Sequence, residues 1–272
     1  MSKLPDIPGN KKCWRILNRI VFGDSLSCPG CESTLQENYK NKYLWCGTCR
    51  RKYRATAHKS SWLYGTKLHP RQLFVLIACW QKRKSTETTV EVAGVSYPTV
   101  TRWYDRFRAH LPDELPLLEV LVKADESYFG KKRSKQPQLI VTGAVEPHTG
   151  RKALRITGVG MAGRSRDVLE KFVTDTMKPG TVVVTDKWHG YSDLPLLGYG
   201  HESHNHSVGD YADTNAAENI WSVAKRHMRK LYGGRLLTNR LEDFCKEWMA
   251  RANQPELFSS PADYLRFTLV PC

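Results

Sequence analysis

The sequence predicts a mixed α/β protein in which a small cysteine-bearing module and a helical region precede a larger α/β domain. Two closely spaced cysteine pairs lie near the N-terminus, and a segment with helical periodicity follows them. From about residue 120, short runs rich in β-branched residues alternate with amphipathic ones, which is typical of a mixed α/β domain. We therefore divide the chain into residues 1–60, 61–112 and 113–272.

The positive charge of the chain is concentrated in its first 110 residues. The whole chain carries a formal charge of +15; residues 1–110 contain 20 Lys and Arg against 7 Asp and Glu, whereas residues 111–272 contain 22 against 20. Such a bias favours a polyanionic partner. We expect nucleic acid rather than a membrane surface, because no amphipathic basic helix is evident. A basic protein without such a partner is the alternative.

The sequence shows no membrane or export signal. No apolar run approaches the roughly 20 residues that span a bilayer, and the N-terminal residues lack the apolar core and cleavage site of a signal peptide. We therefore expect a cytoplasmic protein. Because the cytoplasm is reducing, its eight cysteines are expected to be thiols or metal ligands rather than disulfides.

Two cysteine pairs predict a metal site. Their spacing is C-x2-C-x14-C-x2-C, formed by Cys28, Cys31, Cys46 and Cys49. Each pair forms a tight knuckle that directs two thiolates at one ion, and two knuckles complete a tetrahedral shell. The spacing predicts a zinc ribbon with a structural Zn²⁺; free thiols or a redox C-x-x-C pair are the alternatives. Basic residues after the second knuckle are predicted to contact DNA phosphates, although they also suit a solvated face: Arg50, Arg51, Lys52 and Arg54.

The helical region contains a pattern typical of a helix-turn-helix. The segment LHPRQLFVLIACWQKR has an apolar stripe and a proline near its start, which predicts a helix. In residues 86–108 a short helix is expected to end at Ala93, Gly94 permits a turn, and a second helix begins near Tyr97. The second helix of such a motif enters the major groove. Its predicted DNA contacts are Thr99, Arg102 and Arg106; an ordinary helical hairpin with solvated arginines is the alternative.

The last region has the periodicities of alternating strands and helices. The expected elements are a strand over VLVKADESYFG, a hairpin of LIVTGAVE and ALRITGVG around PHTGR, a helix over SRDVLEKFVTDTM with Ser165 at its N-cap, a strand over TVVVTDKW, a weaker strand over YGHESHNH, and a helix from about Asn215 to Lys230. Period-two runs bounded by turn residues predict the strands, and period 3.6 predicts the helices.

Three acidic residues of this region form a candidate catalytic set. Asp125 lies inside an apolar strand, where a carboxylate is costly unless something binds it. Asp186 directly follows the apolar run VVVT, at the strand end where sites in α/β folds lie. Glu218 is in the first turn of the last helix, and Lys225 follows it by seven residues on the same face. Considered alone, each of two acids also has a structural explanation: Asp186 could cap a turn, and Glu218 could compensate the helix dipole.

Together the three acids have the pattern of a two-metal site. Two-metal phosphoryl transfer requires several carboxylates that converge on ions about 4 Å apart. An RNase H-like domain supplies them from its first strand, the end of its fourth strand and its final helix. Hard oxygen ligands favour two Mg²⁺ or Mn²⁺ ions. Three histidines near the acids are expected to contact DNA or support the site rather than to bind metal: His189, His204 and His206.

The chain resembles the ISXO2-like insertion-sequence transposases, which are related to the Merlin group and belong to the DDE superfamily. The matching strings are ADESYFGKK around Asp125, TDKWHGY around Asp186, and NHSVGDYADTNAAENIWSVAKRHM around Glu218 and Lys225. The resemblance covers nearly the whole chain. It implies a transposase that binds the inverted-repeat ends of its element, cuts DNA and joins it to target DNA, acts as a homodimer or larger oligomer, and is associated with the nucleoid, or is nuclear in a eukaryote.

The third acid has a competitor. Some members of the family have asparagine in place of the third acid, and Asn215 lies on the same helical turn as Glu218. We expect Glu218 to be the third metal ligand and Asn215 to be a further ligand or positioning residue, with Lys225 contacting DNA phosphate. Two other functions remain open: an RNase H-fold nuclease without strand transfer, and a domesticated DNA-binding regulator that has kept only the zinc ribbon and helix-turn-helix.

Overall fold

The computed structural model describes the chain as two compact units. The described residues are 6–57, 59, 61–113, 116–130, 138–186, 188–204, 221–226, 228 and 240–269. One unit comprises residues 1–110 and 256–272, and the other comprises residues 111–255. Residues 256–272 therefore belong to the first unit, whereas the predicted third part extends from residue 113 to residue 272.

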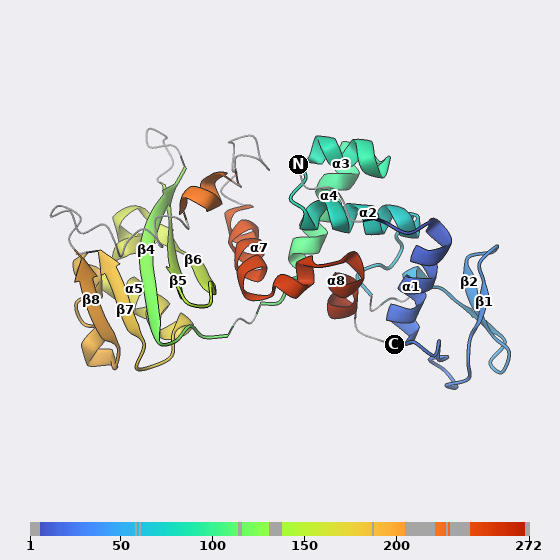
Figure 1. The fold of residues 1–272 in the computed structure, drawn as a ribbon, viewed down its shortest axis with the longest axis horizontal. Coiled ribbons are helices and arrows are strands. Elements are labelled where there is room, and N and C mark those ends of the chain that lie inside the picture. Colours follow the sequence, from blue (N-terminus) through green and yellow to red (C-terminus); the bar gives the residue numbers. More distant parts are fainter. Residues whose placement is uncertain are drawn as a thin grey trace. The chain divides into compact units, whose positions relative to one another are not determined.

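The first unit combines a small sheet with helices (Figure 1). Its antiparallel sheet has the order β1-β2-β3, with β1 at Gln36–Asn38, β2 at Tyr43–Cys46 and β3 at Arg51–Tyr53. Its helices are α1 (Asn10–Phe22), the 3-10 turn η1 (Ala55–Ala57), α2 (Pro70–Gln81), α3 (Thr86–Ala93), α4 (Tyr97–Ala109) and α8 (Pro261–Thr268). The turn η7 (Pro255–Phe258) leads into α8.

Aromatic side chains explain why α8 belongs to this unit. The Tyr264 ring packs against Trp80 at 5.2 Å and against Phe107 at 5.7 Å between ring centroids, and its hydroxyl donates to the Phe107 carbonyl at 2.9 Å. The buried Gln81 amide also donates to the carbonyls of Leu257 and Ser260. Burial of several large rings is among the strongest stabilising contributions that a small core has.

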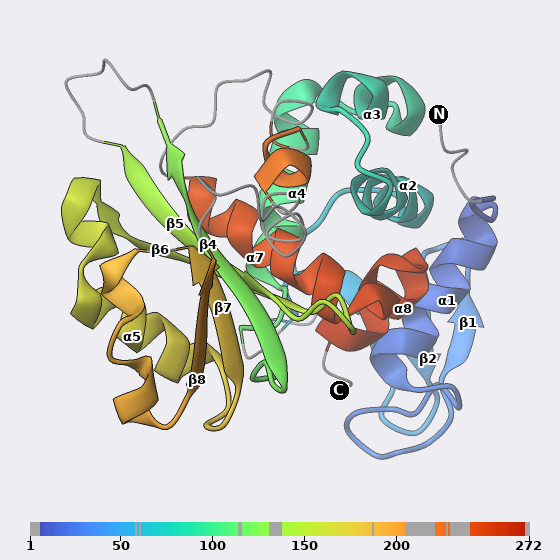
Figure 2. The same ribbon diagram turned by 60° about the vertical axis from the view of Figure 1, so that its left-hand side comes forward.

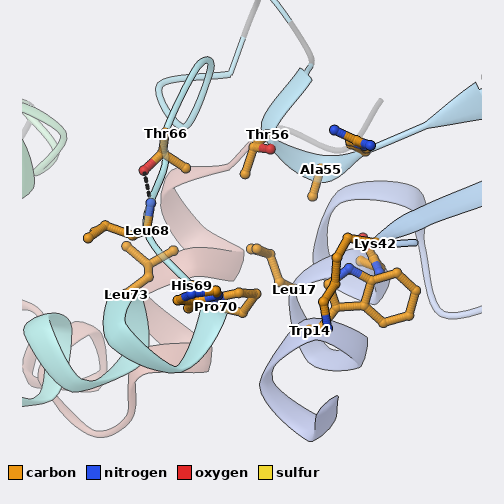
Figure 3. A pocket seen from close by; sticks show the side chains of 12 residues that line it. Trp14, Leu17, Lys42, Ala55, Thr56, Thr66, Leu68, His69, Pro70 and Leu73 are labelled. Carbon is orange, nitrogen blue, oxygen red and sulfur yellow. Dashed lines mark hydrogen bonds between the residues drawn. The ribbon is translucent and has the colours of Figure 1, made fainter. Parts of the chain in front are cut away.

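No helix is predicted before residue 61, yet α1 is amphipathic and contributes to the core. It buries Trp14, Leu17 and Val21, which are spaced by three and four residues and so share one helical face. Trp14 and Leu17 line a pocket together with Leu73 of α2 (Figure 3).

The second unit is built on a five-stranded mixed sheet, as predicted. Its strands are β4 (Leu121–Phe129), β5 (Leu139–Val145), β6 (Lys152–Val159), β7 (Val182–Asp186) and β8 (Gly200–His204). Their order is β6-β5-β4-β7-β8. The predicted hairpin of β5 and β6 is antiparallel, β5 and β4 are antiparallel, and β4, β7 and β8 are mutually parallel.

Helices cover both faces of this sheet (Figure 2). One face packs on α5 (Arg166–Thr176) and the 3-10 turns η2 (Gly160–Arg164), η3 (His189–Tyr191) and η4 (Leu194–Leu197). The other face packs on the helical residues 221–226 and on α7 (Leu241–Asn253), which the sequence analysis did not identify. Ser165 occupies the N-cap of α5, but its side chain makes no capping hydrogen bond.

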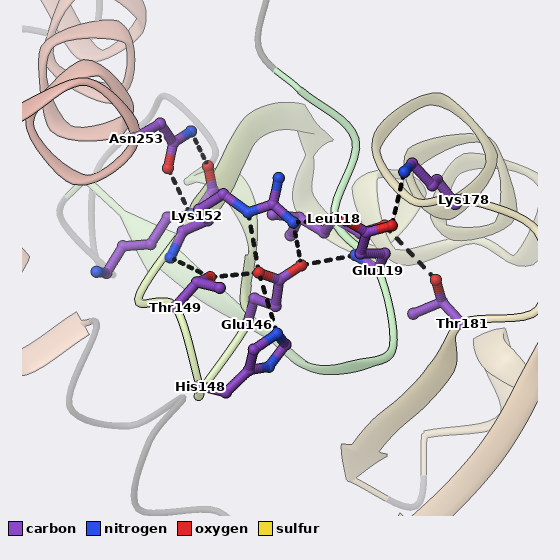
Figure 4. A network of polar contacts seen from close by, with 10 residues as sticks. Leu118, Glu119, Glu146, His148, Thr149, Lys152, Lys178, Thr181 and Asn253 are labelled. Carbon is purple, nitrogen blue, oxygen red and sulfur yellow. Dashed lines mark hydrogen bonds and ion pairs between the residues drawn. The ribbon is translucent and has the colours of Figure 1, made fainter.

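A polar network surrounds the buried Glu146 at the end of β5 (Figure 4). Arg151 donates to both of its carboxylate oxygens, at 2.6 and 2.9 Å, and the Glu119 backbone N–H donates at 2.7 Å. Asn253 of α7 accepts from the Lys152 backbone N–H at 2.7 Å and donates to the Lys152 carbonyl at 2.8 Å. The network ties this end of the sheet to α7.

Candidate functional site

Two of the predicted acids lie on neighbouring strands. Asp125 is on β4, the central strand, and Asp186 is the last residue of β7. The two strands are parallel, and their register pairs Lys123 with Val184. Asp125 follows Lys123 by two residues, and Asp186 follows Val184 by two residues. Both acids therefore lie at the same level of the sheet and on the same face.

Asp125 is a partly buried carboxylate with neighbouring negative charge. Its oxygens accept from the Glu126 backbone N–H at 2.8 Å and from the Trp221 indole N–H at 3.1 Å. Burial first, and then the charges of Glu126 and Asp186, raise the pKa of Asp125 to about 6. A cation bound at such a carboxylate would favour its charged form.

The contact between Trp221 and Asp125 depends on a glycine. Gly143 of β5 pairs with Asp125 across the sheet, and a Cβ atom at Gly143 would lie 2.7 Å from the Trp221 ring. Real side chains do not approach so closely, and therefore only glycine allows the indole to lie against β5 and reach the carboxylate. Phe129 completes the contact with an edge-on ring at 6.0 Å.

Residues 221–226 and 228 are the described part of the predicted last helix, and they include Trp221 and Lys225. Residues 221–226 are helical, and the Lys225 ammonium lies 5.4 Å from the centroid of the Phe129 ring. Asn215, Glu218 and His206 lie outside the described residues, so the third acid remains a prediction. His204 pairs in register with Asp186, and the exposed His189 packs against the Trp188 ring at 4.2 Å.

A second group of side chains behind Asp186 was not found from the sequence. The Glu126 side chain is 1% exposed and pairs with Arg164 at 2.7 Å, and the Tyr191 hydroxyl donates a hydrogen bond to its other oxygen. The same guanidinium lies 3.9 Å from Asp186. Arg164 therefore links a buried acid to a candidate metal ligand. Strand alternation shows that Glu126 faces the opposite side from Asp125; no local pattern indicates Arg164.

The Trp188 side chain holds Arg164 in this position. Its ring lies 4.3 Å from the Arg164 guanidinium, and its indole N–H donates to the Arg164 carbonyl at 3.0 Å. Its backbone N–H donates to Asp186 at 3.1 Å. The orientation of the Asp186 carboxylate is thus set by a backbone donor and a stacked cation.

The four predicted cysteines come together in the first unit. All their sulfur atoms lie within 4.8 Å of one another, with 3.5 Å between Cys31 and Cys46 and 3.9 Å between Cys28 and Cys49. A tetrahedral ion with bonds of about 2.3 Å to sulfur separates its ligands by about 3.8 Å. The spacing fits Zn²⁺.

Donors around the sulfur atoms support the same fit. Backbone N–H groups of Gly30 and Cys49 point at Cys28 and Cys46, and the Tyr53 hydroxyl lies 3.3 Å from the Cys28 sulfur. Hydrogen bonds from Ser33 and Cys49 lower the pKa of Cys31 to about 6, whereas the hydrogen bond to Cys31 and then burial raise the pKa of Cys49 to about 12. Four thiolates are therefore compatible only with a cation between them.

Most of the predicted DNA-contacting residues are exposed in the first unit. Arg50, Arg51, Lys52 and Arg54 are all exposed on or beside β3. Helices α3 and α4 are joined by a short turn, in which Gly94 adopts the left-handed conformation with φ of 62°. On α4, Arg102 is exposed, Thr99 is partly buried, and the Arg106 guanidinium lies 5.1 Å from the Trp103 ring centroid.

Comparison with known proteins decides the family. Residues 116–253 match the ISXO2-like transposase domain, which covers half of the chain and contains both acids. The chain belongs to the ISXO2-like transposase family. A relative from Haemophilus influenzae (strain Rd), described as an "Uncharacterized transposase-like protein", is 31% identical over 91 residues, covering 32% of this chain and 72% of that protein.

Solved structures similar to this ISXO2-like chain include two retroviral integrase cores. The catalytic core domain of BIV integrase has a TM-score of 0.37 and 14% identity, over 49% of this chain and 83% of that one. The HTLV-2 integrase catalytic core domain in complex with magnesium has a TM-score of 0.37 and 11% identity, over 57% and 99%. Separately, none of the described helices combines the length and apolar character needed to cross a bilayer.

Proposed function

We propose that the chain is a DDE transposase that cuts DNA at the inverted-repeat ends of its element and joins the ends to target DNA. Asp125, Asp186 and Glu218 hold two Mg²⁺ or Mn²⁺ ions, and Asn215 is a further ligand or a positioning residue. Lys225 contacts the DNA phosphate beside the cut. The active form is a homodimer or larger oligomer, since two ends must be processed together.

The position of Trp221 at Asp125 is the observation that carries this proposal. The indole donor lies 3.1 Å from the Asp125 carboxylate, and Glu218 precedes Trp221 by three residues. Three residues are nearly one helical turn, so a helix that extended backward from Trp221 would carry Glu218 on the face that touches Asp125. The strand order, with three antiparallel strands and two parallel ones beyond β4, supports an RNase H-like domain.

The donor set suits hard divalent ions. Carboxylate oxygens are the ligands that Mg²⁺ and Mn²⁺ prefer, and the raised pKa of Asp125 marks a carboxylate that a cation would compensate. When bound, the ions supply activation of the attacking oxygen and stabilisation of the leaving oxygen. Asp186 is kept in place by Trp188 and Arg164, and Asp125 is kept in place by the Glu126 backbone N–H and the Trp221 indole.

The first unit supplies DNA binding in this proposal. Its four-cysteine centre holds a structural Zn²⁺, which fixes β3 and its exposed arginines for phosphate contacts. Helices α3 and α4 form a helix-turn-helix, with Arg102 directed at the major groove. The positive charge of residues 1–110, with 20 basic and 7 acidic side chains, supports DNA binding by the first unit.

The proposal is tested on duplexes that end in the inverted repeats flanking the gene. Asp125→Asn is expected to reduce Mg²⁺-dependent cleavage and strand transfer by on the order of 10³-fold, since bound metal contributes several kcal/mol to the transition state. Binding to the ends should be unchanged. Asp175→Asn, which alters an acid paired with Arg155 and Lys171 on α5, is the matched control and should retain full activity.

Four further outcomes discriminate among the alternatives. Unimpaired strand transfer by Asp125→Asn would contradict the assignment. A nuclease would cut the duplex but would not join pre-cut ends, and a regulator would bind without doing either. Glu218→Gln and Asn215→Ala are compared for cleavage and strand transfer. The third metal ligand is the residue whose replacement reduces this activity more.

A further inference from the structure

The Trp221 indole extends across two strands of the second-unit sheet. Its six-membered ring lies over Gly143 of β5, where a Cβ atom would be 2.7 Å from two of the ring carbons. Its N–H donates to Asp125 of β4 at 3.1 Å. Gly143 and Asp125 are cross-strand partners, and directly opposed residues share one face of a sheet. The indole therefore reaches the carboxylate because Gly143 has no side chain.

A hydrophobic cluster holds the indole in this position. Trp221 is 6% exposed and belongs to the same cluster as Phe129, Val141 and Phe244. The Phe129 ring meets it edge-on, with 6.0 Å between the ring centroids and 69° between the planes. A side chain packed this closely has little rotational freedom. The direction of its N–H, toward Asp125, is therefore fixed by packing.

Two donors orient the Asp125 carboxylate and leave room for an ion. The Glu126 backbone N–H donates to Oδ1 at 2.8 Å, and the Trp221 indole N–H donates to Oδ2 at 3.1 Å. An ionised carboxylate has about four acceptor sites on its two oxygens, so within the described part of the chain each oxygen keeps about one site. Carboxylates that bind metal ions are usually hydrogen-bonded in this way by an outer partner.

We propose that Trp221 is a positioning residue for metal binding: its indole N–H orients Oδ2 of Asp125 toward a divalent ion, and Gly143 provides the space for the indole. The inference rests on the proposed two-metal function. The Glu126 N–H belongs to the same strand as Asp125 and sets one oxygen. Trp221 sets the other oxygen from the helical residues 221–226. Without it, the carboxylate can rotate about its Cβ–Cγ bond.

Mn²⁺ binding to the zinc-loaded, full-length protein tests this role in the absence of DNA. Free Mn²⁺ is measured by electron paramagnetic resonance at neutral pH. Trp221→Phe keeps an aromatic ring but removes the donor. It should raise the dissociation constant about tenfold, because the loss of an outer hydrogen bond weakens metal binding by roughly 10- to 100-fold. Saturating Mn²⁺ should restore most of its DNA cleavage, and its binding to inverted-repeat ends should be unchanged.

Two further variants separate the hydrogen bond from packing. Gly143→Ala retains every donor but displaces the indole, so it should weaken Mn²⁺ binding as Trp221→Phe does, and it is a second test if Trp221→Phe does not fold. Trp248→Phe alters a ring of α7 that belongs to the same cluster and is also 6% exposed. It should bind Mn²⁺ as the wild type does. Wild-type affinity in Trp221→Phe, or an equal loss in Trp248→Phe, would overturn the inference.

Failure of this inference differs from failure of the proposed function. If Asp125→Asn loses a Mn²⁺ site that Trp221→Phe keeps with unchanged affinity, only the role of Trp221 falls. If the wild type has no Mn²⁺ site that Asp125→Asn removes, the two-metal function falls together with the role of Trp221. If Mn²⁺ binds as expected but pre-cut ends are not joined, strand transfer alone falls and the role of Trp221 stands.

Discussion

Two carboxylates of the second unit, one fully buried and one partly buried, are held in opposite ways. Glu146 at the end of β5 is fully buried and receives hydrogen bonds from Arg151, Thr149 and the Glu119 backbone. Although burial alone would raise its pKa, these donors outweigh burial and lower it to about 2. Asp125, on the neighbouring strand, has a pKa raised to about 6.

The surroundings of Asp125 account for the difference. It accepts from one indole and one backbone N–H, but it lies beside the charges of Glu126 and Asp186. A carboxylate that stabilises a fold is surrounded by donors and cations, whereas one that binds a metal ion is left undercompensated. The contrast separates a structural acid from a candidate catalytic one within a single sheet.

Glu146→Gln should have the largest effect on stability. Replacing the charge weakens an ion pair with Arg151 and hydrogen bonds from Thr149 and Glu119, and breaking such a buried network costs about 3 kcal/mol. Hydrogen exchange of peptides from β4 and β5 measures the second unit alone. Glu119→Gln, at an acid whose side chain is 41% exposed, is the control and should cost far less. An equal loss in both variants would remove the distinction drawn for Glu146.

Arg164→Gln tests the link between the two kinds of acid. Glu126 would lose its ion pair but can take up a proton, because burial already raises its pKa. We therefore expect a loss of about 2 kcal/mol, near that of one charged hydrogen bond. Asp186 would also lose its neighbouring cation, and the Mg²⁺ concentration needed for half-maximal activity should change. Arg166→Gln, which removes an exposed pair with Asp193, is the matched control. Unchanged metal dependence would limit Arg164 to a structural role.

The five strands of the second unit follow from local patterns, because period-two runs between turn residues depend only on neighbours in the chain. The same patterns made Asp125 and Asp186 conspicuous, as charges within or directly after apolar strands. Contacts between residues far apart in the sequence cannot be predicted from such local patterns. Arg164 meets Glu126 across 38 residues, and Tyr264 reaches Phe107 across 157, so tertiary packing alone decides both contacts.

Divalent metal should stabilise the second unit through Asp125. At a Mg²⁺ concentration ten times the dissociation constant, binding to the folded state contributes about 1.4 kcal/mol, and hydrogen exchange in β4 should slow accordingly. Asp125→Asn should not respond, whereas Glu146→Gln should respond as the wild type does, from its lower starting stability. A metal response that survives in Asp125→Asn would place the ions elsewhere.

Without divalent metal, Asp125→Asn should be slightly more stable than the wild type at neutral pH, by about 1 kcal/mol, since it removes an undercompensated charge. The folded pKa of Asp125 is about 6 and its ordinary value is 3.8, so the destabilising effect of its charge is complete above pH 6 and disappears as the pH falls toward 3.8.

The charge of Glu146 affects stability with the opposite sign. Its stabilising contribution is complete above pH 4.5 and is lost as the pH falls toward 2. The difference between Asp125→Asn and wild type should therefore vanish by about pH 4, where that between Glu146→Gln and wild type is still large. If both differences fade over the same pH range, the two carboxylates are not held in opposite ways.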